Sequence, residues 1–289
     1  METCAPPDPN TRTPAVALPP ESWDAHCHVF GPKANFAYRE GRSYDPPEAP
    51  VENLWRVHDT LGFERGVVVQ SSIHGADNSA MLDALAQSEG RYLGVANLDG
   101  SEPDSEISRL HDAGVRGVRF NFVRFLGGPP DLKIFQRVID AVAAFGWHVV
   151  VHVHGEDLVD HETMFRAIRI PVVVDHMASP DIGQDTGQKT FQLLLELIRD
   201  RGWWTKISNG DRISIQGLPC DDLVPYARCV IEADPDRVLW GTDWPHPMYR
   251  DDRTIPNDCD LVELLYRYTP EPEIRRKVLV DNPKRLLGI

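Results

Sequence analysis

The stretch HVVVHV, residues 148–153, is a run of valines with a histidine near each end. Valine is favoured in strands, and a nearly continuous apolar run is typical of a parallel strand buried on both faces. Similar β-rich runs occupy residues 22–28, 66–72, 92–98, 117–122, 172–177, 204–208 and 238–244. The valine run is therefore one of eight comparable units along the chain.

Helical patterns occupy the segments between these runs. They include residues 52–63, 78–90, 131–146 and 190–202, and several of them end in glycine, which is a common helix C-terminal signal. Strands that alternate with helices eight times predict an α/β fold of the (β/α)8 TIM barrel type, with residues 22–289 as one domain. Residues 1–21, rich in proline and threonine, predict an extended N-terminal arm over the domain surface. Residues 29–50 form a long connection and are a candidate cover for the barrel mouth.

Composition excludes several classes of function. The chain has 289 residues and a net charge of −14, without a block of Lys and Arg that could contact nucleic acid. No apolar run approaches the roughly 20 residues that span a bilayer, and no secretory signal is visible, so no membrane contact is expected. The five cysteines are scattered and form no CxxC motif, which predicts reduced thiols and a cytoplasmic location. Both a monomer and a homo-oligomer agree with these features.

Polar side chains gather where the predicted strands end. In barrel enzymes the active site lies at the C-terminal ends of the strands. The side chains in these positions are His26 and His28 on the first strand, Ser71 and Ser72 on the second, Arg119 and Asn121 on the fourth, His152 and His154 on the fifth, His176 on the sixth, Ser208 on the seventh and Asp243 on the eighth. Polar residues inside apolar strands are costly unless they are paired. One histidine at a strand end is usually structural, but this joint pattern predicts a functional site.

The remaining histidines receive a plainer interpretation. His58, His111, His148 and His161 lie in helical patterns or at a strand start, and we expect them at the surface. For His246, in the sequence WPHP, a structural role in a loop and a place at the rim of the site are equally good interpretations. Trp203 and Trp204 are expected to pack in the core.

Several of these motifs resemble the amidohydrolase superfamily. The segments DAHCHVFGP, FNFV, VVVDHM and LWGTDWPHP carry the resemblance, which runs from about residue 22 to the C-terminus. More narrowly, the chain resembles the branch of lactonases that act on 2-pyrone-4,6-dicarboxylate and on muconolactone-type compounds in bacterial aromatic catabolism. The resemblance implies a hydrolase that opens a small anionic lactone, including a sulfonated muconolactone as a candidate substrate.

The resemblance also implies roles for individual residues. His26, His28, His176 and Asp243 match the inner set of residues in that branch. Of these, His28, His176 and Asp243 would be catalytic, with Asp243 activating water. Tyr44, Ser72, Arg119 and Arg212 match positions that hold the carboxylates and the carbonyl of the substrate. Arg124, in a loop, and His154, at the end of the fifth strand, are further candidate substrate-binding residues.

Two departures from the branch bear on the metal and the substrate. The branch has a tyrosine where this chain has His152, and an arginine where this chain has Phe125. A histidine at the first position would restore the set His26, His28, His152 and Asp243 as ligands of one divalent metal ion. Three nitrogens and one oxygen suit Zn²⁺. Metal-free catalysis, which the resemblance implies for the lactonase itself, is the alternative.

Two rival functions agree with parts of this pattern. A metal-dependent decarboxylase or hydratase of a related aromatic acid would use the same ligands. A non-catalytic barrel that binds a small molecule is more remote, because no member of the inner set is missing. A two-metal phosphotriesterase-like centre is disfavoured, since the fourth strand, GVRFNF, lacks the lysine that would bridge the metals.

Overall fold

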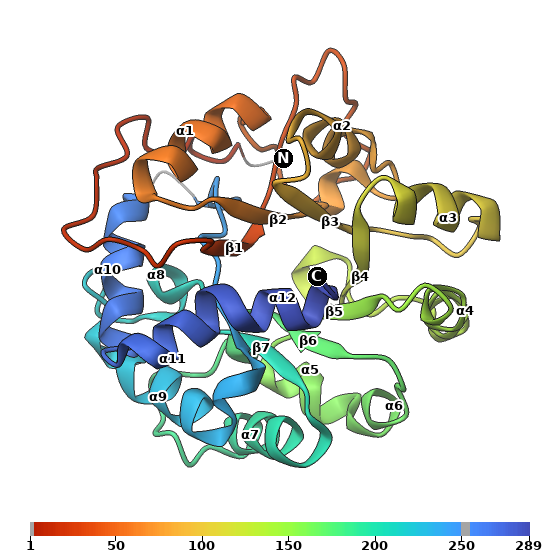
Figure 1. The fold of residues 1–289 in the computed structure, drawn as a ribbon. Helices are drawn as coiled ribbons and strands as arrows, with labels where there is room; N and C mark the ends of the chain where they lie inside the picture. The colour runs from red at the N-terminus through yellow and green to blue at the C-terminus, as the bar shows by residue number, and fades with distance from the viewer. Residues whose placement is uncertain (1–2, 250–254) are drawn as a thin grey trace.

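The computed structural model describes residues 3–249 and 255–289, and its strands form one parallel sheet in the order β1 to β8 (Figure 1). The strands are β1 Trp23–Cys27, β2 Arg65–Val69, β3 Tyr92–Ala96, β4 Val115–Asn121, β5 His148–His152, β6 Val172–Val174, β7 Trp204–Lys206 and β8 Val238–Leu239. All eight predicted strands are confirmed. Most of them end a few residues earlier than predicted, because the polar residues beyond them leave the ladder to form turns.

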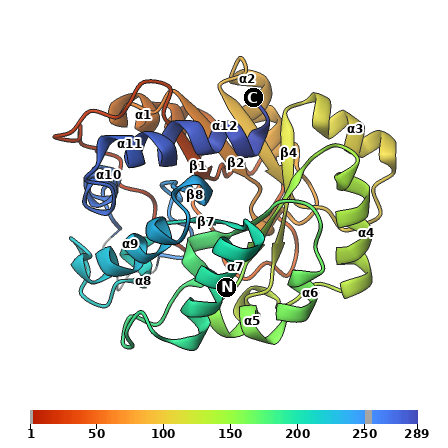
Figure 2. The same cartoon turned by 60° about the horizontal axis from the view of Figure 1, so that its bottom comes forward.

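Helices surround the sheet in both views of the molecule (Figure 1; Figure 2). Their bounds are α1 Val51–Leu61, α2 Ser79–Gln87, α3 Asp104–Asp112, α4 Leu132–Ala143, α5 Gly155–Asp160, α6 Glu162–Arg166, α7 Lys189–Arg201, α8 Gly210–Ile213, α9 Val224–Ala233, α10 Asp258–Tyr268, α11 Pro272–Arg276 and α12 Asn282–Leu287. The fold is the predicted (β/α)8 barrel. In the described ranges, no helix has the length and apolar character needed to cross a membrane.

The core has two parts because the strands are buried on both faces. Val67 and Val69 of β2 point into the barrel and join an inner cluster, whereas Val68 between them joins the larger cluster under the helices. Leu287 of α12 belongs to the inner cluster, and α12 crosses the barrel in Figure 1. The end of the barrel at which the strands begin, called the lower end here, is therefore filled. The opposite end, at which the strands finish, is left for a site.

The barrel is closed at the seam between β8 and β1 by separate backbone contacts. The Ala25 N–H donates to the Trp240 carbonyl at 2.9 Å, Asp243 N–H to the His26 carbonyl at 2.8 Å and His28 N–H to the Trp244 carbonyl at 2.7 Å. Residue 241 must be glycine here, because a Cβ on it would lie 2.4 Å from the His26 nitrogen. The seam thus joins the two stretches that carry the predicted inner set.

Two histidines lie elsewhere than predicted. His58 and His148 were expected at the surface, yet both are buried. His58 lies on the apolar face of α1, where both of its ring nitrogens have partners, and His148 begins β5 inside the lower barrel. The packing of Trp203 and Trp204 is confirmed, since both are buried.

Candidate active site

A cavity of about 710 Å³ opens at the C-terminal ends of the strands. Of the residues singled out from the sequence, its wall includes His28, Tyr44, Ser71, Ser72, Arg119, His152, His154, His176, Arg212 and Asp243. His26 is fully buried behind this wall. Side chains separated by more than 200 residues in the sequence therefore meet in one place, as expected for a barrel site.

Local backbone turns aim two of these side chains. His176 and Asp243 both have left-handed backbone conformations, with φ of 52° and 59°. The whole segment from His176 to Ser179 has positive φ. Such conformations are uncommon for residues with a Cβ and often mark functional sites. His176 lies two residues after the end of β6 and Asp243 four residues after the end of β8, so the chain turns at the rim of the barrel while the side chain stays at its mouth.

His26, His28 and Asp243 form a compact triangle. His28 Nε2 lies 3.1 Å from Asp243 Oδ1, His26 Nε2 lies 3.4 Å from the same oxygen, and the two Nε2 atoms are 3.3 Å apart. His28 Nδ1 faces the Val69 carbonyl at 2.6 Å, so that nitrogen carries the hydrogen. His28 therefore turns Nε2 toward Asp243 and the cavity.

A buried ion-pair network lies beneath the triangle, and sequence reasoning missed two of its members. Asp175 Oδ1 lies 2.9 Å from Lys206 Nζ, and Asp175 Oδ2 accepts a hydrogen bond from Arg119 Nε at 2.9 Å. Lys206 Nζ also lies 2.8 Å from His26 Nδ1. A lysine within the predicted strand WTKIS, residues 204–208, was the available signal, because a buried ammonium requires a carboxylate partner.

The surroundings set the charge of the inner groups. Burial raises the pKa of Asp243, but the Arg212 guanidinium and the contact with His28 outweigh burial and hold its pKa well below the usual range. Burial lowers the pKa of His176 to about 4 and also lowers the pKa of His152 well below its usual value. Near pH 7 the cavity thus presents Asp243 as a carboxylate and His176 and His152 as neutral imidazoles.

The triangle satisfies a simple test for a tetrahedral metal ion. Ligands about 2.0–2.1 Å from a tetrahedral zinc ion lie roughly 3.3–3.4 Å from one another, close to the three separations in the triangle. His26, His28 and Asp243 form one of the described groups whose ligand atoms approach within 4.8 Å of one another. His152 is outside that group, although its ring lies 5.7 Å from the ring of His176.

The same atoms also accommodate hydrogen bonds without a cation. If Lys206 donates to His26 Nδ1, the ring hydrogen of neutral His26 is on Nε2, which then points at Asp243. For His26 to bind a cation through Nε2, its hydrogen must instead sit on Nδ1, where Asp175 Oδ1 at 3.3 Å can accept it. The donor set therefore fits a metal in one of two hydrogen arrangements.

Among the described residues, Arg212 is the arginine that forms an ion pair with Asp243. Its Nη2 lies 3.3 Å from Asp243 Oδ2, and its guanidinium lies over the Tyr249 ring at 5.1 Å. Arg212 Nε and Nη2 are buried and have no hydrogen-bond partner among the described residues. His152 Nδ1 is likewise buried without a hydrogen-bond partner among the described residues. Buried polar groups without partners are rare, so these atoms mark places where a ligand can bind.

Arg124 does not line the cavity, contrary to the prediction. Its side chain is 77% exposed, and it points toward Asp157 and Asp160 at 4.0 and 3.5 Å. The turn Arg124–Leu126 sends the arginine outward, while Phe125 and Leu126 take their places in the cavity wall.

The N-terminal arm reaches the cavity rather than only covering the surface. Thr3 and Cys4 line its wall. The Cys4 N–H donates to the Asp45 carbonyl at 3.0 Å, which ties the arm to the connection 29–50 that supplies Ser43 and Tyr44. Sequence reasoning missed this contact, because it depends on pairing between segments that show no periodicity.

His246 has a structural role in the described contacts. Its Nε2 lies 3.1 Å from Asp258 Oδ1, and both side chains are buried. Its backbone N–H donates to the Asp243 carbonyl at 2.8 Å. It anchors the turn after β8 to α10 and is absent from the cavity wall.

Comparisons with known proteins agree with this architecture. The amidohydrolase family profile matches residues 23–289. The chain is 43% identical over 286 residues to the 2-pyrone-4,6-dicarboxylate hydrolase of Comamonas testosteroni, covering 96% of this chain and 93% of that one. It is 38% identical to the 4-sulfomuconolactone hydrolase of Rhizobium radiobacter, covering 99% and 96% of the two chains.

A solved structure shares the fold. The probable 2-pyrone-4,6-dicarboxylic acid hydrolase of Acinetobacter baumannii, crystallised with citric acid bound, superposes with a TM-score of 0.80 at 25% identity over 93% of this chain and 100% of that one. Because the family profile spans nearly the whole barrel and two relatives exceed 30% identity over almost the full length, this chain belongs to the amidohydrolase family.

Proposed function

We propose that this protein hydrolyses a small anionic lactone of aromatic catabolism, such as 2-pyrone-4,6-dicarboxylate or a sulfonated muconolactone. The observation that carries the proposal is the Asp243–His28 pair at 3.1 Å, which faces a cavity whose wall also contains Arg119 and Arg212. Relatives that match along almost the whole chain are named as hydrolases of these two lactones.

The proposed substrate is an anion although the chain carries a charge of −14. Long-range attraction is therefore unfavourable, and affinity must come from donors inside the mouth. Arg212 offers two buried nitrogen atoms without hydrogen-bond partners among the described residues, and Arg119 is a second guanidinium in the wall. Guanidinium groups suit carboxylate and sulfonate oxygens. The bound citric acid in the Acinetobacter baumannii structure is a polycarboxylate of this kind.

The hydrolytic step follows from the positions of the inner groups. The oxygen of a water molecule adds to the lactone carbonyl carbon, and Asp243 takes the proton that the water loses. His176 lies at the cavity wall as a candidate donor to the carbonyl oxygen as it gains charge, since its Nδ1 contacts the Ser208 hydroxyl at 2.8 Å and its Nε2 can carry the ring hydrogen. When the ring C–O bond breaks, Asp243 returns the proton to the leaving oxygen. Ring opening therefore consumes one water and releases no other fragment.

We also propose that the triangle of His26, His28 and Asp243 holds one divalent cation, with Zn²⁺ suited to its two imidazoles and one carboxylate. His152 is proposed as the fourth ligand, after a rotation that brings its ring to the triangle. When bound, such an ion supplies a Lewis acid and lowers the pKa of coordinated water. A hydrogen-bonded, metal-free triangle is the alternative arrangement.

Product analysis tests the proposed function. Purified protein is incubated with each of the two lactones, and the products are identified by NMR together with a measurement of CO₂. Ring opening with gain of one water and no CO₂ supports a lactonase. Release of CO₂, hydration without ring opening, or no turnover of either lactone contradicts the proposal.

A further inference from the structure

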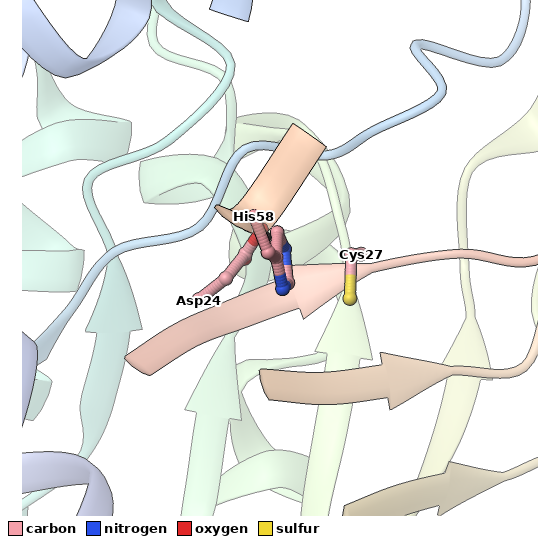
Figure 3. Close-up of side chains that lie close together, drawn as sticks. All are labelled: Asp24, Cys27 and His58. Carbon is pink, nitrogen blue, oxygen red and sulfur yellow. Dashed lines mark hydrogen bonds and ion pairs between the residues drawn. The ribbon is translucent and has the colours of Figure 1, made fainter. Parts of the chain in front are cut away.

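A second buried Asp–His pair lies behind the triangle, on the outer side of β1. Asp24 Oδ2 lies 3.0 Å from His58 Nε2, and both side chains are fully buried. Figure 3 shows the two side chains meeting beside β1, with Cys27 farther along the strand. The pairing of β1 with β2 shifts register between Asp24 and Cys27, so Asp24 faces α1 although it precedes His26 by only two residues.

Asp24 accepts four hydrogen bonds from three residues. The backbone N–H groups of His26 and Thr242 donate to Oδ1 at 2.9 and 3.1 Å. The Thr242 hydroxyl and His58 Nε2 donate to Oδ2 at 2.5 and 3.0 Å. A carboxylate can accept all four, whereas an amide must turn its NH₂ group toward two of these donors.

In the series of contacts from Asp24 through His58 to Tyr92, the Asp24 carboxylate determines which ring nitrogen of His58 carries the hydrogen. His58 Nε2 donates to Asp24, so Nδ1 accepts the Tyr92 hydroxyl at 2.8 Å. Cys27 Sγ donates to the Val67 carbonyl at 3.3 Å, and burial raises the pKa of this thiol well above its usual value. Although Asp24, Cys27 and His58 are close enough to hold a cation, their ligand atoms already have protein partners.

Of the two backbone groups that Asp24 holds, one belongs to a residue of the triangle and the other to the residue that precedes one. One belongs to His26 itself, and the other belongs to Thr242, which directly precedes Asp243. The Thr242 hydroxyl also accepts the Trp244 N–H at 3.0 Å. The residue before Asp243 thus binds Asp24 directly, and the residue after it is connected to Asp24 through the Thr242 hydroxyl. Asp24 therefore spans the seam where β8 contributes only two residues to the sheet.

We propose that Asp24 is a positioning residue, which sets the Asp243–His28 geometry through Thr242 and His26, with His58 and Tyr92 holding the Asp24 carboxylate in place. The inference rests on the proposed lactonase function for its kinetic consequence. Displacement of a catalytic group by about 1 Å can cost on the order of 100-fold in rate, without loss of substrate binding.

The test measures lactone hydrolysis by wild type, Asp24→Asn, Thr242→Val and Thr242→Ser. We expect kcat to fall about 10- to 100-fold in the Asn and Val variants with little change in the Michaelis constant. Thr242→Ser keeps the hydroxyl and should recover most of kcat. Thr269→Val is the matched control, because Thr269 is a buried threonine whose hydroxyl bonds the Leu265 carbonyl away from the seam. Its kcat should equal that of wild type.

Three results would overturn the inference. The first is a wild-type kcat in Thr242→Val. The second is a kcat for Thr269→Val that falls as far as that of Thr242→Val at an equal loss of melting temperature, because lost stability alone would then explain the effect. The third is no recovery of kcat by Thr242→Ser. If Asp24→Asn does not fold, the Thr242 series decides. If wild type hydrolyses neither lactone, the proposed function fails, and a crystal structure of Thr242→Val decides the positioning role: displacement of Asp243 from His28 supports it, and an unchanged 3.1 Å separation overturns it.

Discussion

Two Asp–His pairs lie on either side of β1, and they have almost the same separation. His28 Nε2 and Asp243 Oδ1 are 3.1 Å apart, and His58 Nε2 and Asp24 Oδ2 are 3.0 Å apart. The first pair lines the cavity, whereas the second lies under α1 and is fully buried. The same two side-chain types therefore serve two purposes, and their surroundings decide which.

The difference lies in how the carboxylate oxygens are occupied. Asp24 accepts four hydrogen bonds from fixed donors, two of them from the backbone. Asp243 faces Arg212, His28 and His26 at 3.1 to 3.4 Å, all from side chains at the cavity or just behind it. A saturated carboxylate holds a structure together, while a carboxylate held by side chains at a cavity keeps room for a proton from water. We call these the closed pair and the open pair.

Replacing the open carboxylate tests the comparison most severely. Asp243→Asn keeps the shape of the side chain but cannot accept a proton as a carboxylate does, so kcat should fall about 100- to 10,000-fold while the fold is retained. Initial rates and far-UV circular dichroism check both parts. Activity above about a tenth of wild type would remove Asp243 as the base.

Metal analysis asks whether the open pair differs from the closed pair in holding a cation. We expect one zinc ion per chain by elemental analysis, and loss of activity on the order of 100-fold after chelation, with recovery when Zn²⁺ is restored. His26→Gln should lower the zinc content, whereas His58→Gln should leave it unchanged. A metal-free preparation that is fully active and insensitive to chelators would assign the triangle to hydrogen bonding.

Charge removal at the open pair should affect binding of anions. Arg212→Met should raise the Michaelis constant for an anionic lactone about 10- to 150-fold, since a charge-assisted bond contributes about 1.5–3 kcal/mol. Arg212→Lys should recover only part of this loss, because an ammonium cannot make the two-pronged contact. Arg119→Met should act in the same direction. A neutral lactone that loses as much as the anionic one would show that these arginines only support the structure.

Acid should reduce the contribution that buried His148, which belongs to neither pair, makes to the free energy of unfolding. Burial and, to a smaller extent, Lys206 lower the pKa of His148 to about 3. The unfolded chain binds the proton near pH 6.5, so the stability from neutral His148 is fully present above that pH and falls as pH drops toward 3, by up to about 1.4 kcal/mol per pH unit. Urea unfolding of wild type and His148→Gln between pH 7 and 5 should therefore show a smaller stability difference at the lower pH. Parallel curves would contradict this.

Sequence periodicity predicted the barrel, because valine-rich runs and amphipathic helices carry local signals. The strand-end rule brought His28, His176 and Asp243 together correctly, since parallel strands share one carboxyl edge. It could not place Arg124, whose direction depends on one short turn. Nor could alternation place Asp24, because the register shift in β1 turns it away from the face of His26.

Long-range pairing accounts for the other residues that were missed. Lys206 and Asp175 are adjacent only after β6 and β7 align, and the pairing of Thr3 with Asp45 has no sequence pattern. His58 looked like a surface histidine, because its partners Asp24 and Tyr92 come from two different strands. Contacts of this kind depend on the closed barrel rather than on any one segment.

The most direct test of the proposed site is a crystal structure of the Asp243→Asn variant soaked with intact 2-pyrone-4,6-dicarboxylate or 4-sulfomuconolactone. We predict the lactone carbonyl beside His28 and the substituted side chain, an anionic group of the lactone on Arg212, and the Asp24–His58 pair unchanged at about 3.0 Å. A lactone bound away from position 243, or with its anionic groups turned from both Arg119 and Arg212, would contradict the proposed site.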